Sequence, residues 1–170
     1  VEKSRRKNEA QEFARAVRGW RRSWSVRQLS QSLWITVVGG GIGGLSEALG
    51  LARSGQRVCL LEQAPSFLAA GAGIQLSPNA TKVLLQLGLG QALAEVCVLP
   101  EATLIRKWRS GKLISRTPLG DTARARYGAP YYHAHRGDLL KVLAEAALAE
   151  PSIDVQLGVR VEGLRQHSNG

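Results

Sequence analysis

The sequence predicts an α/β fold built around a parallel β-sheet, and two observations carry that prediction. The first is the stretch ITVVGGGIGGL (35–45), in which a short apolar, β-branched run leads into a cluster of glycines. The second is another apolar run at residues 57–61, which follows after the length of one helix. A strand, a helix and a second strand in this order form the repeating unit of a parallel sheet.

Each element of this unit has its own local signal. Residues 35–38 are apolar without alternation, which predicts a strand buried on both faces. The helix that follows ends near Gly55, a residue suited to a left-handed cap. Its apolar face consists of Leu45, Ala48, Leu49 and Ala52.

The glycine cluster has the spacing G-x-G-x-x-G at Gly39, Gly41 and Gly44. In this spacing the first glycine permits a tight turn, the second lets the backbone approach a pyrophosphate, and the third lets the helix pack closely on the strand. Glu62 stands at the end of the second strand, where a carboxylate accepts hydrogen bonds from ribose hydroxyls and repels a 2′-phosphate. These residues predict an adenine dinucleotide site for either FAD or NAD.

Beyond Glu62 the sequence does not continue into a third short α/β unit. Ser77-Pro78 is typical of a helix start, and that helix has an apolar face at Val83, Leu84 and Leu87. Residues 103–108 and 112–116 predict a hairpin with a Ser-Gly turn. Residues 131–148 predict a strand that enters a helix near Arg136, whose side chain is suited to bidentate phosphate contact or to an ion pair with Asp138.

Three separated motifs decide between the two cofactors. GAGIQLSPNATKVLLQLGL (71–89) and YYHAHRGDLLKVLAEAAL (131–148), together with VVGGGIGGL and LLEQA, resemble the N-terminal part of the FAD-dependent aromatic-ring monooxygenases. The resemblance is greatest to the salicylate- and 3-hydroxybenzoate-hydroxylase-like group and covers roughly residues 34–170. It implies FAD and a Rossmann-like FAD/NAD(P)-binding fold: a parallel sheet with helices on both faces plus a small antiparallel β element, incomplete at the C-terminus.

The resemblance also implies which residues contact the cofactor. The glycine loop would hold the pyrophosphate, Glu62 with Gln63 beside it would bind the adenosine ribose, and Val161, in an expected strand at 159–164, would touch the adenine. The stretch 71–75 would run along the ribityl and flavin end, and Arg136 would reach the phosphate and ribityl region. The full set is Gly39, Gly40, Gly41, Ile42, Gly43, Gly44, Glu62, Gln63, Gly73, Ile74, Gln75, Arg136 and Val161. Many relatives have Arg at the position of Gln63, so the charge of that residue is absent here.

The activity implied by the resemblance is hydroxylation of a benzoate- or salicylate-like substrate with NADH or NADPH and O₂, through a flavin C4a-hydroperoxide. The chain begins with Val1 and lacks the substrate-binding part of such enzymes. We therefore expect residues 34–170 to be a truncated FAD-binding domain that is inactive alone, and the sequence indicates no catalytic residue. Two alternatives stay open: the FAD-binding half of another flavin oxidoreductase such as an oxidase or epoxidase, and a non-catalytic dinucleotide-binding module anchored by its basic extension.

The net charge of +10 is concentrated at one end, because residues 1–33 hold nine Lys or Arg against three Glu. We expect this segment to be a loosely ordered or helical extension, with contact to an anionic membrane as an alternative and no nucleic acid partner. Cys59 and Cys97 are read as buried thiols of a cytoplasmic protein. His133 and His135 have no third ligand nearby, so no metal is expected.

Overall fold

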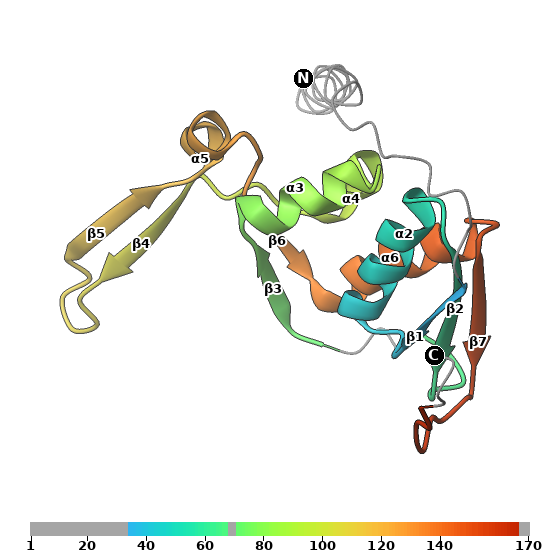
Figure 1. The fold of residues 1–170 in the computed structure, drawn as a ribbon. Coiled ribbons are helices and arrows are strands. Elements are labelled where there is room, and N and C mark those ends of the chain that lie inside the picture. The colour runs from blue at the N-terminus through green and yellow to red at the C-terminus, as the bar shows by residue number, and fades with distance from the viewer. Residues whose placement is uncertain (1–33, 68–70, 167–170) are drawn as a thin grey trace. The chain divides into compact units, whose positions relative to one another are not determined.

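The computed structural model describes residues 34–67 and 71–166 and divides into two compact units. One unit contains residues 34–67 and 143–166, and the other contains residues 71–142. Figure 1 labels their helices and strands. The basic extension 1–33 lies outside the described residues.

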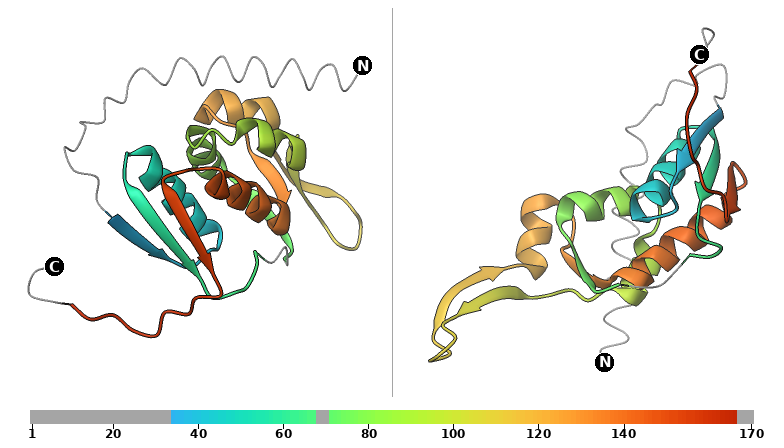
Figure 2. Two further views of the ribbon diagram at one scale, coloured as in Figure 1. Left: turned by 90° about the vertical axis from the view of Figure 1, so that its right-hand side faces the viewer. Right: turned by 90° about the horizontal axis from the view of Figure 1, so that it is seen from below.

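A parallel sheet forms the centre of the first unit. Its strands are β1 (Trp34–Val38), β2 (Arg57–Glu62) and β7 (Ile153–Leu157), in the order β1-β2-β7. The register aligns Val38 with Leu61 and Glu62 with Leu157, so the carboxyl ends of all three strands lie at one edge. Helix α2 (Ile42–Arg53) packs against the three strands, as the views of Figure 2 show. The predicted α/β fold with a parallel sheet is confirmed.

The core of this unit lies between α2 and the sheet, where the apolar face of the helix meets the side chains of β2 and β7. The buried residues are Leu45, Ala48, Leu49, Val58, Leu60 and Ile153. The prediction that β1 is buried on both faces is wrong, because Trp34 and Val38 are 63% and 62% exposed. The reason is that β1 is an edge strand of the described sheet and α2 covers only one of its faces.

The second unit contains the small antiparallel β element. Strand β3 (Gly73–Leu76) pairs with β6 (Tyr132–His135), and α3 (Pro78–Gln86) packs on β3 and on α5 (Gly120–Tyr127). This unit also contains helix α4 (Gly90–Val96). Helix α6 (Arg136–Leu148) begins in this unit, and its residues from 143 onward belong to the first unit. Helix α6 starts at Arg136, directly after β6, as the sequence predicts.

Helix α3 begins where the sequence predicts but buries a slightly different face. Ser77 is its N-cap and Pro78 its first residue. Leu84 and Leu87 are buried as expected, whereas Val83 is 49% exposed and Thr81 is fully buried. A residue two positions away lies about 200° around a helix, so burial of Thr81 turns Val83 toward solvent.

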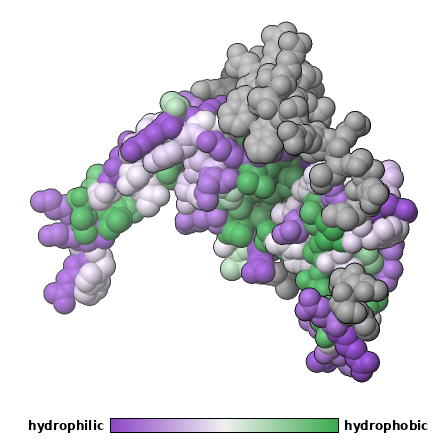
Figure 3. Space-filling view, viewed as in Figure 1, coloured by the Kyte–Doolittle hydropathy of each residue, from purple (hydrophilic) through white to green (hydrophobic). Residues whose placement is uncertain are grey.

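The predicted hairpin is formed by β4 (Ala102–Arg106) and β5 (Leu113–Pro118). Gly111 has the positive φ of 66° that the turn requires. The hairpin carries large apolar side chains that are exposed, and Figure 3 shows them as a hydrophobic band along it. They are Leu104, Ile105, Trp108, Leu113 and Ile114.

Two further expectations are wrong. Residues 159–164 do not form a strand, because no strand in the described part of the chain pairs with them; two backbone hydrogen bonds hold the start of this segment instead. Cys59 and Cys97 are free and only half-buried. Burial, with the charge of Asp138 as a smaller cause, still raises the pKa of Cys97 to about 11.

Candidate functional site

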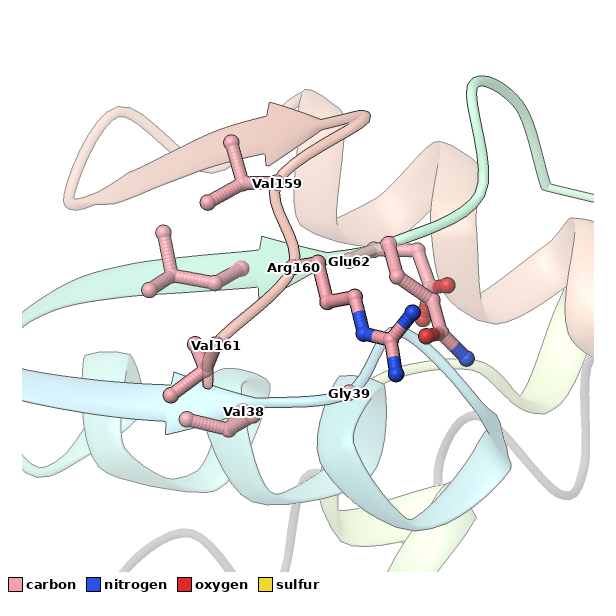
Figure 4. Close-up of a pocket in the computed structure, with 8 residues that line it drawn as sticks. Val38, Gly39, Glu62, Val159, Arg160 and Val161 are labelled. Carbon is pink, nitrogen blue, oxygen red and sulfur yellow. The ribbon is translucent and has the colours of Figure 1, made fainter. Parts of the chain in front are cut away.

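A pocket of about 330 Å³ opens at the carboxyl ends of β1 and β2, where ligands of open parallel sheets bind. Apolar side chains form most of its wall, and Gly39 brings backbone to its edge (Figure 4). Glu62, Gln63 and Arg160 are its polar residues. The complete lining is Val38, Gly39, Leu61, Glu62, Gln63, Val159, Arg160 and Val161.

The glycines of the loop between β1 and α2 fall into two groups. Gly39, Gly40 and Gly44 are required by the fold itself. Gly39 has a φ of +105°, which side-chain-bearing residues rarely adopt. A Cβ on Gly44 would overlap the carbonyl oxygen of Gly39, and a Cβ on Gly40 would lie 2.9 Å from the ring of Phe67. The predicted close packing of helix on strand therefore depends on Gly44.

The second group, Gly41 and Gly43, lies beside open space. A Cβ on either residue would meet nothing within 4 Å. The first hydrogen bond of the helix is donated by Leu45 N–H to the carbonyl of Gly41, so the amides of residues 42–44 precede it and belong to the free first turn. No acidic residue lies in that turn of the described helix. The loop thus presents free amides with no Cβ at Gly41 or Gly43, which is the arrangement that binds phosphate.

Glu62 connects this loop to the sheet. Gly40 N–H donates to one carboxylate oxygen at 2.5 Å, and Ala64 N–H donates to the other at 2.8 Å. These two hydrogen bonds, with that to Ala64 the larger cause, lower the pKa of Glu62 below its ordinary value, against a smaller opposing effect of burial. The residue is therefore an anion at neutral pH. Each oxygen keeps a second lone pair for another donor.

Val161 lies in the same pocket as Glu62 although the segment around it is not a strand. Its side chain is 43% exposed, and Val38, drawn beside it in Figure 4, is 62% exposed. Exposed valines inside a concave site provide flat apolar walls suited to an aromatic heterocycle. Of the predicted residues in this unit, the structure brings Gly39, Glu62, Gln63 and Val161 together in the pocket lining.

The stretch 71–75 and Arg136 belong to the other unit, and there the structure brings them together. Gly73 pairs with His135 and Gln75 with His133 in the β3–β6 ladder, and Arg136 N–H donates to the carbonyl of Ala72 at 3.1 Å. A Cβ on Gly71 would lie 2.9 Å from the Cβ of Arg136, so this glycine makes room for the arginine stem. Two motifs about 60 residues apart in sequence thus form one local structure.

The aromatic side chains around β6 are explained by packing and hydrogen bonding. Tyr132 is buried, whereas Tyr131 donates its hydroxyl hydrogen to the side-chain oxygen of Gln75 at 2.7 Å. The ring of His133 meets the ring of Tyr131 edge-on, with centroids 5.7 Å apart. Within residues 34–67 and 71–166, no group of three His, Cys, Asp or Glu side chains could hold a metal ion. None of the helices in these ranges is both long enough and apolar enough to cross a bilayer.

Four residues of the lining are absent from the predicted site set: Val38, Leu61, Val159 and Arg160. Arg160 is the charged one among them. It follows β7 by three residues, and the glycine-loop motif fixes no spacing to it. Arg160 could have been placed at the site only from the pairing of β7 with β2. Because Glu62 aligns with Leu157, the residues just after β7 must pass the carboxyl end of β2.

A family model described as an FAD binding domain matches residues 33–170. The chain belongs to this FAD binding domain family. Its cofactor is therefore FAD, as the motifs 71–89 and 131–148 imply.

The relatives of this FAD-binding chain are named as hydroxylases of aromatic rings. It is 44% identical over 130 residues to a 3-amino-4-hydroxybenzoate 2-monooxygenase of Streptomyces cremeus, covering 76% of this chain and 32% of the relative. It is 38% identical over 130 residues to a 3-hydroxybenzoate 6-hydroxylase of Klebsiella oxytoca, covering 76% of this chain and 33% of the relative. The chain thus spans about a third of the length of the curated relatives it matches.

Solved structures show the same fold. Klebsiella pneumoniae HpxO, crystallised with FAD and uric acid, matches with a TM-score of 0.68 and 27% identity. The match covers 81% of this chain and 34% of that structure. The expected Rossmann-like fold and the resemblance to the aromatic-ring monooxygenases are both confirmed.

Proposed function

We propose that this chain is the FAD-binding part of an NAD(P)H-dependent monooxygenase that hydroxylates an aromatic acid of the benzoate or salicylate type. The observation that carries the proposal is that two relatives, each matched over 76% of the chain, are named as a 3-amino-4-hydroxybenzoate 2-monooxygenase and a 3-hydroxybenzoate 6-hydroxylase. The site geometry supports the same conclusion, because a dinucleotide loop and a ribose-binding carboxylate share one edge of the sheet.

In this proposal the first unit holds the adenosine diphosphate half of FAD. The open faces of Gly41 and Gly43 and the free amides of the first turn of α2 fit the pyrophosphate. Glu62 accepts hydrogen bonds from the ribose hydroxyls with the lone pairs that Gly40 and Ala64 leave free. Val161 contacts the adenine, and the remaining contacts come from Gly39, Gly40, Ile42, Gly44 and Gln63.

The second unit supplies the contacts to the rest of the cofactor. Gly73, Ile74 and Gln75 lie on β3 with their backbone along the antiparallel pair, and Tyr131 fixes the side chain of Gln75 through its hydroxyl. Arg136 is exposed at the start of α6, where its planar guanidinium is available for phosphate and ribityl oxygens. The close approach of Gly71 fixes the direction in which the arginine stem leaves the helix.

Bound FAD would supply the redox chemistry, taking a hydride from NADH or NADPH and, once reduced, activating O₂ for insertion into the ring. The residues described here bind and orient the cofactor. Positioning the substrate and excluding water from the reacting atoms belong, in this proposal, to the two thirds of the relatives' length that the chain does not span. We therefore expect the isolated chain to retain FAD weakly or not at all through purification and to show no turnover.

The test is a product assay on a protein that carries this chain at the full length of its relatives. Purified with FAD and supplied with NADH or NADPH, it should convert a hydroxybenzoate or salicylate to a ring-hydroxylated product. Oxidation of the nicotinamide without any hydroxylated product from a panel of aromatic acids would identify an oxidase instead. Substrate-stimulated NADH oxidation by residues 1–170 alone would contradict the expectation that the chain is inactive.

A further inference from the structure

Arg160 is the only cationic side chain among the eight residues that line the pocket. Its side chain is exposed and extends across the pocket toward the side where Glu62 and Gly39 lie (Figure 4). Gln63, the residue after the ribose-binding carboxylate, contributes no charge. Any positive side-chain charge that this lining offers to a ligand therefore comes from the segment after β7.

The backbone around Arg160 is held by the end of β2. Val159 N–H donates to the carbonyl of Glu62 at 2.9 Å, and Gly158 N–H donates to the carbonyl of Ala64 at 3.0 Å. These bonds continue the β2–β7 pairing past the last paired residues, Glu62 and Leu157. Arg160 directly follows Val159, whose N–H is bonded to Glu62. The position of the Arg160 Cα relative to Glu62 is therefore set by main-chain hydrogen bonds rather than by side-chain packing.

The charges of the site create a requirement that Arg160 meets. The lowered pKa of Glu62 keeps a full negative charge at the ribose end of the pocket, and the pyrophosphate of FAD brings further negative charge to the glycine loop. The dipole of α2 places the equivalent of about half a positive elementary charge at its N-terminus, which neutralises only part of this negative charge. A guanidinium between these anions lowers their mutual repulsion and has the planar donor geometry that matches phosphate oxygens.

We propose that Arg160 binds the adenosine diphosphate half of FAD and sets the affinity of the chain for the intact dinucleotide. The inference rests on the proposed function only in placing that half of FAD in this pocket. It assigns to the segment after β7 the positive charge that Gln63 does not provide.

The experiment is equilibrium titration, with added FAD, of a cofactor-free protein that carries this chain at the full length of its relatives, followed by FAD fluorescence at low and at high salt. The variants are Arg160→Gln, which removes the charge, and Arg160→Lys, which keeps it. Arg116→Gln is the matched control, because Arg116 is an exposed arginine on β5 outside the pocket lining. Thermal unfolding without FAD checks that the four proteins are equally folded.

We expect Arg160→Gln to weaken FAD binding about tenfold at low salt, the usual effect of losing one charged hydrogen bond. The salt dependence of its dissociation constant should fall, because the screened charge is gone. Arg160→Lys keeps the charge but loses the planar pair of donors, so it should bind FAD more tightly than Arg160→Gln and more weakly than the wild type. Arg116→Gln should bind FAD as the wild type does. Equal FAD affinities and equal salt dependences for wild type and Arg160→Gln would overturn this inference alone, whereas a wild-type chain without measurable FAD binding would overturn the FAD site as well.

Discussion

Replacing Gly44 by alanine tests whether the glycine loop is shaped by the contact between α2 and β1. The added Cβ would overlap the carbonyl oxygen of Gly39 and lie 3.1 Å from its carbonyl carbon, so the helix or the loop must move. Overpacking against backbone costs about 1–3 kcal/mol. The better helix propensity of alanine recovers roughly 0.5–1 kcal/mol. We expect a net loss of about 1 kcal/mol for Gly44→Ala.

The control is Gly50→Ala in the same helix, where a Cβ would meet nothing within 4 Å. This variant should gain about 0.5–1 kcal/mol, because it receives the propensity benefit without the clash. Urea unfolding of both variants without FAD measures the difference in their free energies of unfolding, which should be about 2 kcal/mol with unchanged m-values because the propensity gain is common to both. Equal unfolding midpoints for Gly44→Ala and Gly50→Ala would refute the close-packing explanation of the third glycine.

Two further changes test the sheet and the carboxylate. Leu60→Ala, at a fully buried position on the central strand, should destabilise the chain by about 2–4 kcal/mol in urea unfolding, whereas Leu104→Ala on the exposed hairpin should change it by less than about 0.5 kcal/mol. Glu62→Gln should cost roughly 1 kcal/mol at pH 7, a value reduced for the solvent around this half-exposed residue. Because the pKa of Glu62 is lowered, the stability it contributes is complete above about pH 5 and is lost as the pH falls through the lowered pKa. The unfolding midpoints of wild type and Glu62→Gln should therefore converge as the pH falls below that pKa. A gap that stays constant with pH would contradict the hydrogen-bonded carboxylate.

The features that the sequence predicted correctly are those set by neighbouring residues. The turn at Gly39, the helix after it and the position of Glu62 follow from a short pattern whose geometry is nearly independent of the rest of the chain. The helix start at Ser77-Pro78 and the entry of β6 into α6 at Arg136 are equally local.

The features that the sequence missed depend on long-range pairing. Residues 159–164 have a strand-like pattern, but a strand needs a neighbour, and the described residues offer none there. The exposure of Val38 follows from the edge position of β1, which no local pattern reveals. Arg160 reaches the pocket because β7 pairs with β2 across about 100 residues of sequence.

The proposed FAD site requires that the loop after β1 bind the pyrophosphate through glycines that have open space beside them and are not needed for packing. Gly41→Ala tests it most directly, because a Cβ on Gly41 meets no protein atom within 4 Å and the φ of −77° suits alanine. FAD titration should give a dissociation constant raised at least about tenfold for Gly41→Ala, with wild-type urea stability and with unchanged FAD binding in Gly50→Ala. An FAD affinity of Gly41→Ala equal to that of the wild type would contradict the claim.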